Sequence, residues 1–518
     1  MKYLLIFFLL FSLSFSQLTR PEKTNYEETS RYEDVMNFLN EVLKNSTDMK
    51  MTTLGVSTEG KRLPMIVYGN VPNPSPEAVK KSGKLCVYIQ GNIHAGEVEG
   101  KEAVLQILRE IKNGRHQQWK KHLVILWVPI FNADGNDKIS LYNREYQNGP
   151  VAGMGTRENG QGLDLNRDHM KLESPEVLSF VKVLNEYDPA VTVDLHTTNG
   201  SFHAYQLTYG YALNPNLEPK LDNFSQKIFF PEASKRMLKK KWRTRAYGDY
   251  MERTPAGKPG YYFWAHQPRF NHNYVGLRNR LSVLSEAYSY IPFKERIRVT
   301  KDFVETLLDL IIEQAESIRK LETQADEISS SIVQQDSLAV RAEIAESNPA
   351  LKVLLAPPIR VRNPYSNEVM FLMNEDSIHE IVTTEFEKAI AKKKAAVPSA
   401  YIIPDSLSDL LGLLDAQGIR YSRTAQTQTM TVQKFQITEN KPANYPFQKH
   451  TMRTLNGQFE TVTAVIPAHS ILVPMTQPLS RIVFYLLEPE SEDGAAAWNL
   501  LDSHYGDGKY FPILKVVQ

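Results

Sequence analysis

The residues best suited to chemistry in this sequence are two histidines and a glutamate that could bind one metal ion. His94 and Glu97 lie three positions apart in the segment Gly91-Asn-Ile-His-Ala-Gly-Glu97, and His196 follows the strand-like segment Val191-Thr-Val-Asp-Leu195 about a hundred positions later. Imidazole nitrogens and carboxylate oxygens are zinc ligands, and a catalytic zinc uses three of them and leaves one position open. The pattern predicts one zinc ion per chain, bound by His94, Glu97 and His196.

Each of these residues has a plainer interpretation when it is taken alone. His94 could be a surface histidine, and Glu97 could be a glutamate at a helix start, where the helix dipole favours an acidic side chain. His196 could be a strand-end histidine that is bonded to the backbone. The metal site is favoured because His196 adds a third ligand at the end of another expected strand.

A polar segment, 157–168, lies between the two halves of the candidate metal site. In an extended chain Asp164 and Asn166 project to the same side. The planar guanidinium of Arg167 can hold a carboxylate through two hydrogen bonds, which is how an enzyme would bind the free C-terminus of a peptide. The plainer alternative is a local turn with paired surface charges.

A further carboxylate, Glu286, follows the apolar run 281–284. A buried glutamate is costly unless it is paired or used, so Glu286 is a candidate general base beside the metal. The alternative is an ion pair with Arg278 or Arg280.

These candidates fall where short apolar runs end, so the elements that carry them decide whether they meet. Strand-like and helix-like runs alternate along the first part of the chain, with strands at 85–89, 122–130, 190–195 and 281–284 and helices at 104–111 and 175–187. The alternation predicts an α/β domain with a largely parallel central sheet flanked by helices. Ligands bind beyond the carboxyl ends of the strands in such sheets, which is where the candidates lie.

The chain is too long for a single domain. An apolar helical stripe becomes polar and rich in Ser and Gln by 329–335. We therefore expect a catalytic domain at 35–325, a linker at 326–345 and a smaller, β-rich α+β accessory domain at 346–518.

The expected accessory domain holds no cluster of histidine, cysteine or carboxylate residues in its sequence. We expect helices at 386–396 and 407–414 and an extended run at 481–487. A structural or substrate-docking role is all that the sequence suggests for it.

The N-terminus has the pattern of a secretory signal peptide at 1–16, followed by a short N-terminal segment at 17–34. Lys2 precedes the apolar run 4–11, and the small residues Ser14 and Ser16 stand at positions −3 and −1 of the expected cleavage site. The apolar run is too short to span a bilayer. We expect an exported protein, either periplasmic or extracellular, with no membrane span.

Composition narrows the function further. A formal net charge of +1 and 42% hydrophobic residues exclude a disordered chain and give no sign of a nucleic-acid partner. The one strongly basic stretch, 235–245, is interpreted as a solvated helix face or loop, with an anionic substrate or surface as the alternative. Cys86 is the single cysteine, so no intramolecular disulfide can form. The sequence does not indicate the oligomeric state.

Four motifs in this order resemble the zinc metallocarboxypeptidases related to carboxypeptidase A: His94-x-x-Glu97, Asp164-Leu-Asn166-Arg167, His196 and Glu286. The resemblance covers about residues 35–320. Two short motifs, Gln477-Pro478 and Leu487-Glu-Pro-Glu-Ser491, are also similar to the C-terminal extension of large secreted bacterial members. The family resemblance implies a central mixed, largely parallel sheet flanked by helices.

The resemblance also implies a role for each motif. His94, Glu97 and His196 would bind zinc, and Glu286 would be the general base. Asp164 would accept a hydrogen bond from the His94 ring.

The same resemblance assigns the substrate-binding residues. Asn166 and Arg167 would hold the terminal carboxylate of the substrate. Arg157 would stabilise the oxyanion, with Arg144 as the alternative.

The mobile tyrosine of the family is harder to place. Tyr261, Tyr262 and Tyr274 all precede Glu286 in a suitable region, and we favour Tyr274. Paired tyrosines such as Tyr261 and Tyr262 are more typical of a packed aromatic cluster.

The implied activity is that of a secreted zinc carboxypeptidase that acts on peptide or protein C-termini. One alternative is a zinc amidase or deacylase that acts on cell-wall stem peptides or other acyl-amino acids. The other is a peptide-binding relative without catalysis, although this sequence retains all the residues that such relatives usually lose.

Overall fold

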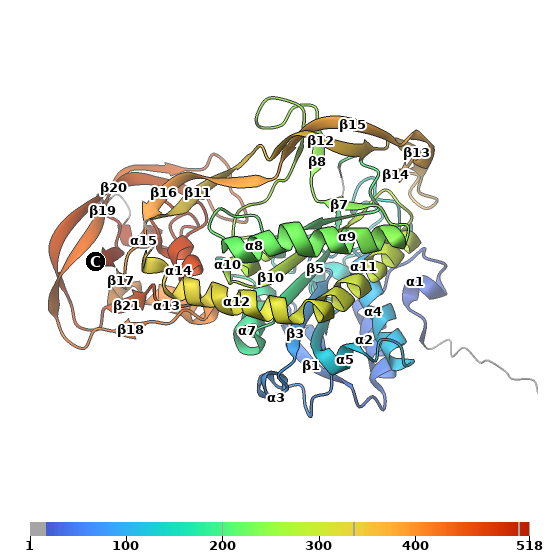
Figure 1. Ribbon diagram of the computed structural model, residues 1–518, viewed down its shortest axis with the longest axis horizontal. Coiled ribbons are helices and arrows are strands. Elements are labelled where there is room, and N and C mark those ends of the chain that lie inside the picture. The colour runs from blue at the N-terminus through green and yellow to red at the C-terminus, as the bar shows by residue number, and fades with distance from the viewer. Residues whose placement is uncertain (1–16, 199, 335–336, 506–507, 517–518) are drawn as a thin grey trace, which may run out of the picture.

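The structure is a computed structural model that describes residues 17–198, 200–334, 337–505 and 508–516. The expected signal peptide at 1–16 lies outside these residues. Within the described part of the chain, no helix is both long and apolar enough to cross a membrane. Figure 1 shows a sheet with flanking helices formed by the N-terminal part (17–334) and strand-rich structure formed by the C-terminal part (337–516).

The N-terminal part is built on an eight-stranded sheet. In spatial order its strands are β1 (Met49–Val56), β2 (Arg62–Tyr68), β4 (Leu123–Val128), β3 (Leu85–Gly91), β5 (Val191–Thr198), β10 (Leu281–Tyr288), β6 (Leu207–Gly210) and β7 (Thr244–Ala246). The four central strands β4, β3, β5 and β10 are parallel, whereas β1, β2 and β6 join by antiparallel pairing. The predicted α/β fold with a mixed, largely parallel sheet is confirmed.

Helices cover both faces of this sheet. They are α1 (Arg20–Lys23), α2 (Tyr32–Leu43), α3 (Pro76–Lys81), α4 (Glu99–Lys112), α5 (Trp119–His122), α6 (Ala133–Asp137), α7 (Pro175–Tyr187), α8 (Pro219–Phe224), α9 (Phe230–Lys239), α10 (Asn271–Leu277), α11 (Phe293–Glu313) and α12 (Ala315–Ser330). β3 is buried along its whole length. Its mainly apolar sequence is typical of a strand that is covered on both faces.

Two contacts of β3 show which helix lies on which face. The backbone of α4 comes so close that a Cβ atom on Gly91 would lie 2.8 Å from the Lys101 nitrogen. On the other face, Phe180 of α7 packs on Tyr88 with ring centroids 5.1 Å apart. Side chains alternate between faces along a strand, so α4 and α7 lie on opposite sides of the sheet.

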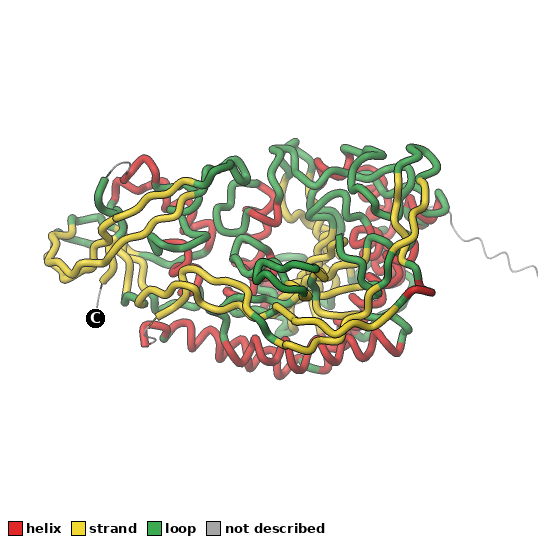
Figure 2. The backbone as a smooth tube through the Cα atoms, turned by 90° about the horizontal axis from the view of Figure 1, so that it is seen from above, coloured by secondary structure: helices red, strands yellow, loops and turns green. Residues whose placement is uncertain are grey.

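The C-terminal part continues the fold through several small sheets. Its strands are β11 (Ser337–Ala345), β12 (Asn348–Leu355), β13 (Pro358–Arg362), β14 (Val369–Met373), β15 (His379–Phe386), β16 (Lys388–Ala396), β17 (Ala400–Ile403), β18 (Ser422–Arg423), β19 (Gln428–Pro442), β20 (Arg453–Ile466), β21 (Ile471–Pro474) and β22 (Leu514–Val516). Its helices are α13 (Ser408–Gln417), α14 (Ser480–Leu487) and α15 (Asp502–Tyr505). Figure 2 shows these strands in yellow, extending from the C-terminal part across to the N-terminal part.

Strand pairing joins the two parts directly. β12 and β15 form one sheet with β9 (Gly260–Tyr262) and β8 (Asp249–Met251) of the N-terminal part. The pairing of β15 with β9 is parallel and runs from Thr384 to Phe386. The expected linker at 326–345 covers the end of α12 and all of β11. The chain after it returns to the N-terminal part, because β15 pairs with β9.

The secondary structure predicted for the C-terminal part is wrong for two of three segments. Residues 386–396 form mainly β16 instead of a helix, because they pair along their length with β11. Residues 481–487 belong to α14, in which every side chain is buried, instead of an extended run. The helix expected at 407–414 is confirmed as α13.

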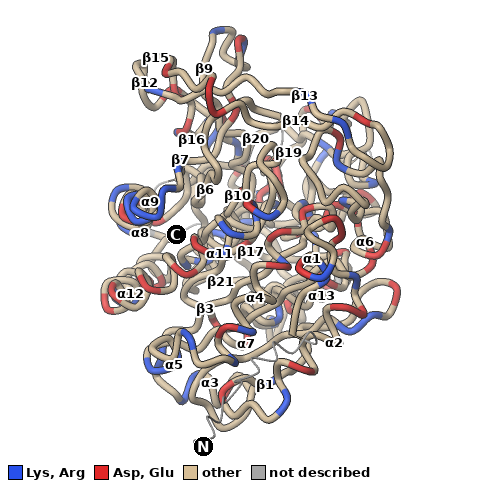
Figure 3. Tube along the Cα trace, turned by 90° about the vertical axis from the view of Figure 1, so that its right-hand side faces the viewer, with Lys and Arg blue, Asp and Glu red and all other residues tan. Residues whose placement is uncertain are grey.

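Charged residues of both signs are mixed along the chain (Figure 3). The basic stretch 235–245 begins in α9, where Arg236 forms an ion pair of 2.5 Å with Glu313. Lys240 forms another, of 3.1 Å, with Asp302. These pairs lie on a solvated helix face and its following turn, as the plainer interpretation predicts.

Candidate active site

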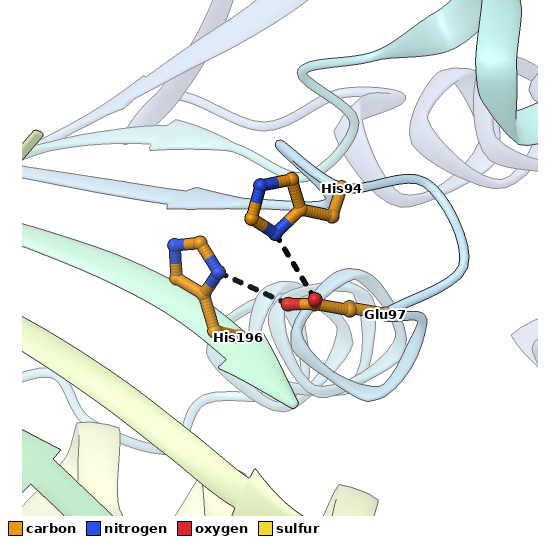
Figure 4. Close-up of side chains that lie close together, drawn as sticks. All are labelled: His94, Glu97 and His196. Atoms are coloured by element: carbon orange, nitrogen blue, oxygen red, sulfur yellow. Dashed lines mark hydrogen bonds and ion pairs between the residues drawn. The ribbon is translucent and has the colours of Figure 1, made fainter. Parts of the chain in front are cut away.

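Three side chains with metal-binding atoms meet at the carboxyl ends of β3 and β5. One ligand atom from each of His94, Glu97 and His196 lies within 4.8 Å of the other two, and all three residues are buried. Glu97 is at the centre, with one oxygen 3.0 Å from His94 Nδ1 and the other 3.0 Å from His196 Nδ1. Figure 4 shows the three side chains pointing toward one another.

The local backbone explains how His94 and Glu97 come together. The chain turns sharply after β3 at Asn92, whose φ of 69° is left-handed, and the Asn92 side-chain amide donates to the carbonyls of Ala95 and Glu97. A Cβ atom on Gly96 would lie 2.8 Å from the Gly155 carbonyl oxygen. This tight turn places Glu97 immediately before α4.

A second carboxylate orients each histidine. His94 Nε2 lies 2.9 Å from Asp164 Oδ1, and His196 Nε2 lies 2.8 Å from Asp194 Oδ2. A carboxylate on one ring nitrogen fixes the tautomer and leaves the other nitrogen free to bind a metal. The donor set, two oriented imidazoles and a carboxylate, fits a zinc ion.

The electrostatics of this cluster differ from those of isolated side chains. Burial alone would raise the pKa of Asp164, but His94 and two arginines outweigh it and hold that pKa well below its ordinary value. Burial would lower the pKa of His196, but Asp194 outweighs it and raises that pKa well above its ordinary value. The histidines are thus embedded in an excess of negative charge, an environment that attracts a cation.

Asp194 was not among the residues expected from the sequence. It stands two positions before His196 in β5, so the two side chains project from the same face of the strand. The signal that could have found it is an aspartate and a histidine at two-residue spacing in an otherwise apolar strand.

Of the two candidate arginines, Arg157 faces the cavity. Its Nε donates to Asp164 at 2.8 Å, and its side chain is 35% exposed. Arg144 instead donates to Glu97 and to the Thr197 carbonyl, both at 2.8 Å. The guanidinium of Arg144 is therefore engaged in supporting the candidate ligand Glu97.

Glu286 lies in β10 directly beside His196 of β5 in the parallel register. It is 8% exposed and faces the cavity. Burial raises the pKa of its carboxyl group, and the neighbouring Glu97 adds to this effect, although His196 and two arginines oppose it.

The expected alternative partners of Glu286 are engaged elsewhere. Arg278 donates to Tyr274, to Asn185 and to the Gln417 carbonyl. Arg280 forms ion pairs with Asp188 and Asp326. Neither arginine pairs with Glu286.

Asn166 and Arg167 line the same cavity. The Asn166 side-chain oxygen accepts from the Asn271 backbone nitrogen at 2.8 Å. The Arg167 guanidinium lies over the Phe270 ring, 4.2 Å from its centroid, and donates to the Asn166 carbonyl at 2.7 Å. Both side chains are held in place from α10 and the loop before it.

The favoured tyrosine is not at the cavity. Tyr274 is fully buried, and its hydroxyl is bonded to Gln417 and Arg278, so it is a packing residue between α10 and α13. Tyr261 and Tyr262 are also buried and do not line the cavity. The tyrosine that does line it is Tyr247, in the loop between β7 and β8, where no sequence pattern marks it.

These residues surround one cavity of about 200 Å³. It is lined by His94, Glu97, Arg157, Asn166, Arg167, His196, Thr197, Thr198, Tyr247, Trp264, Ala265, Phe270, His272, Leu284 and Glu286. One end holds the candidate metal ligands and Glu286, and the cations Arg157 and Arg167 stand beside them. The remaining wall combines apolar and aromatic side chains with polar ones, among them His272, which the sequence did not single out.

Comparison with known proteins agrees with this geometry. Residues 35–245 match the family model described as zinc carboxypeptidase. The chain is 22% identical to Carboxypeptidase 2 of Trichophyton rubrum over 507 residues, which covers 94% of this chain and 86% of that protein. It is 21% identical to Carboxypeptidase 2 of Trichophyton tonsurans over 479 residues, covering 89% and 81%.

Solved structures were also matched. A metallo-carboxypeptidase from Burkholderia cenocepacia is 17% identical, with a TM-score of 0.42 over 55% of this chain and 70% of that one. A carboxypeptidase A from Helicoverpa armigera is 15% identical, with a TM-score of 0.42 over 56% and 75%.

Proposed function

We propose that this chain, in which residues 35–245 belong to the zinc carboxypeptidase family, is a zinc-dependent peptidase that hydrolyses the C-terminal peptide bond of peptides. The observation that carries the proposal is that the candidate metal ligands, Glu286 and Arg167 line one cavity. Metal-assisted hydrolysis next to a free carboxylate requires a metal site, a proton acceptor and an anion-binding cation together.

The metal site would be formed by His94, Glu97 and His196. A zinc ion there would polarise the carbonyl of the bond to be cleaved and make a water molecule a stronger nucleophile. Asp164 and Asp194 would keep the two histidines in the orientation that binding requires. Arg144, bonded to Glu97 at 2.8 Å, would hold the third ligand in place.

Glu286 would transfer the proton. Its carboxylate would accept a proton from the attacking water and then donate that proton to the departing amine. Its position in β10 beside His196 supports this role. The raised pKa of Glu286, which burial causes, also suits a group that must bind a proton during the reaction.

The arginines would bind the substrate. Arg167 and Asn166 would hold the terminal carboxylate, because the guanidinium offers two parallel N–H donors and the amide offers another. Arg157 would donate to the carbonyl oxygen as negative charge develops on it. The aromatic side chains of Tyr247, Trp264 and Phe270 would contact the terminal residue.

The test is hydrolysis of N-blocked dipeptides and of their C-terminally amidated twins by the purified protein. We expect release of the C-terminal amino acid from the acids only. Glu286→Gln should retain zinc but lose roughly 10²–10⁴-fold in turnover, whereas Glu33→Gln, a change on the exposed face of α2, should retain activity. Equal activity of Glu286→Gln and wild type would contradict the proposal.

The panel also separates the alternative activity. Hydrolysis of acylated cell-wall stem peptides with no release from ordinary dipeptides would indicate a zinc amidase. No hydrolysis of either class would favour a peptide-binding protein.

We also propose that the protein is exported and that the signal peptide is removed after Ser16. In support, the carbonyl of Gln17 accepts from Arg109 of α4 at 2.9 Å, so the chain is anchored to the fold from this residue onward. N-terminal sequencing of the secreted protein should begin at Gln17. A mature protein that retains Met1 would contradict this proposal.

A further inference from the structure

We propose that the turn between β19 and β20 in the C-terminal part is a positioning element of the active site. The turn consists of Phe447, Gln448, Lys449 and His450, and it lies against the loop that contains Asp164. This inference rests on the proposed function, because it concerns the residues that orient the metal ligand His94. It also gives the C-terminal part a role that its own sequence does not suggest.

The central contact is made by Gln448. Its side-chain oxygen accepts a hydrogen bond of 2.8 Å from the backbone nitrogen of Asp164. The Asp164 carboxylate in turn lies 2.9 Å from His94 Nε2 and accepts from Arg157 Nε at 2.8 Å. One side chain of the C-terminal part thus fixes the residue that orients both a metal ligand and a substrate-binding arginine.

The other three side chains of the turn hold it at this place. Lys449 Nζ donates to the Gln161 carbonyl at 2.5 Å, and His450 Nε2 lies 2.8 Å from a Glu173 oxygen. Phe447 packs on Trp498 and beneath the Arg269 guanidinium. The turn therefore contacts the chain on both sides of Asp164, at Gln161 before it and at Glu173 after it.

The backbone of the turn is specialised for this presentation. Phe447 and His450 exchange both backbone hydrogen bonds, at 2.8 and 3.0 Å, so the turn has two central residues. Gln448 and Lys449 have φ values of 51° and 66°, as a type I′ turn requires, although such turns favour Asn and Gly. A glutamine at the first of these positions is consistent with a need for its side chain at Asp164.

Three variants separate the hydrogen bond from general packing. Gln448→Met keeps the length of the side chain but removes the acceptor, and Gln448→Glu keeps an acceptor. Lys449→Ala is the matched control in the same turn, because it removes a contact that does not involve Asp164. Thermal unfolding checks that each variant remains folded.

The first readout is amide hydrogen exchange of the 157–167 segment in the metal-free protein, which depends on neither zinc nor catalysis. Gln448→Met should exchange about threefold or more faster than wild type in this segment, while Gln448→Glu and Lys449→Ala should differ little at Asp164. The second readout is zinc affinity by chelator competition, where Gln448→Met should bind severalfold more weakly.

The outcomes distinguish this inference from the proposed function. Unchanged exchange and unchanged zinc affinity in Gln448→Met would overturn the positioning role, whatever the activity of the protein. Faster exchange and weaker zinc binding in a protein that hydrolyses no peptide would support the positioning role and overturn the proposed function alone.

A different observation carries a second inference, which concerns the substrate side chain. His272 at the start of α10 lines the cavity and is 2% exposed. Neither of its ring nitrogens has a hydrogen-bond partner among the described residues. A buried polar group without a partner is costly, and here it stands in the wall of a cavity that would receive substrate.

The position of His272 identifies which part of the substrate it would meet. Leu284 lies two residues before Glu286 in β10 and lines the same cavity, so the cavity extends along the strand away from the candidate metal site. Ser282, two residues further, donates to the His272 carbonyl at 2.8 Å. His272 is therefore tied to β10 through Ser282 and shares the cavity wall with Phe270 and Leu284.

We infer that His272 binds the side chain of the C-terminal residue and favours uncharged polar side chains. Burial lowers the pKa of His272 to about 3, so the ring is neutral at pH 7 and offers one donor and one acceptor. Ala265, Phe270 and Leu284 add apolar surface to the same cavity. A substrate side chain that is apolar along its length and ends in an amide or hydroxyl would match both the neutral His272 ring and the apolar side chains beside it.

The test compares nearly isosteric C-terminal residues, Gln against Met and Tyr against Phe, in otherwise identical blocked dipeptides. Wild type should favour the polar member by about tenfold or more in kcat/KM. His272→Phe should lose this preference, and His272→Gln should retain part of it. Equal or better cleavage of Met and Phe by wild type would overturn this inference alone, and no cleavage of any dipeptide would overturn it together with the proposed function.

Discussion

Replacement of Asp194 by asparagine should weaken zinc binding strongly while it leaves the fold intact. Asp194 is fully buried, with one oxygen accepting from Gln90 at 3.0 Å and the other 2.8 Å from His196 Nε2. When His196 binds a metal through Nδ1, its proton is on Nε2. The carboxylate therefore meets two N–H groups: one oxygen accepts a hydrogen bond from Gln90, and the other forms an ion pair with the His196 ring.

An asparagine cannot satisfy both donors, because it has one oxygen and one NH2 group. In Asp194→Asn the NH2 group must face a donor, either on Gln90 or on His196. One buried donor left without an acceptor costs about 1–3 kcal/mol. If this cost is paid mainly in the zinc-bound state, zinc affinity falls by roughly 5- to 150-fold.

The assay is competition for zinc with a chelator of known affinity, at pH 7 and constant ionic strength. Asp188→Asn is the matched control, because Asp188 lies just before β5 and pairs with Arg280 at the surface. The control should bind zinc as wild type does. If Asp194→Asn also binds zinc as tightly as wild type, the reasoning about the orientation of His196 is wrong.

Three further predictions follow from the structure. Tyr247→Phe should change kcat/KM for peptide acids severalfold, because Tyr247 lines the cavity. Tyr274→Phe should instead lower the melting temperature with little effect on KM, because the Tyr274 hydroxyl is bonded in the interior. The reverse pattern would contradict the placement of Tyr247 at the cavity and of Tyr274 in the interior. Arg167→Met should reduce cleavage of peptide acids by at least about tenfold without creating activity on amides, because a charge-assisted hydrogen bond contributes about 1.5–3 kcal/mol. Undiminished cleavage of the acids by this variant would refute the binding of the substrate carboxylate by Arg167. Burial would raise the pKa of Glu110, but bonds to His116 and a lysine outweigh burial and lower that pKa to about 2. The ionised Glu110 therefore stabilises the folded protein fully above pH 4.5, and this stabilisation is lost as the pH falls toward 2. Glu110→Gln should lower the free energy of unfolding by about 1–2 kcal/mol at pH 6, allowing for solvent screening, and the difference from wild type in urea titrations should vanish near pH 2.

The sheet and the residues at its carboxyl ends could be predicted because local patterns determine them. The apolar runs of β3, β5 and β10 are buried on both faces, so their sequences mark them as strands. Parallel pairing then brings the strand ends together, which is why His94, His196 and Glu286 could be expected at one place.

Other features depend on contacts between residues far apart in the chain. Residues 386–396 have a helix-favouring composition, yet β16 forms because β11 offers a strand to pair with. In the same way, the buried surroundings of α14 allow a helix in a run of β-branched and aromatic residues. Tertiary contacts outweigh local propensity in both cases.

The supporting residues of the site were the hardest to predict. Tyr247 reaches the cavity from an irregular loop, and Gln448 reaches Asp164 across 284 positions of sequence. No local pattern encodes such a contact. The Tyr274 hydroxyl is likewise bonded to Gln417 of α13, a partner that only the packing of the C-terminal part supplies.

The proposed activity is tested most directly by following a single unmodified peptide by mass spectrometry during incubation with the purified protein. We expect stepwise loss of single residues from the C-terminus, no loss from the C-terminally amidated peptide, arrest by a chelator and recovery when zinc is restored. Cleavage of the amidated peptide at the same rate, or cleavage that continues in the zinc-free protein, would contradict it.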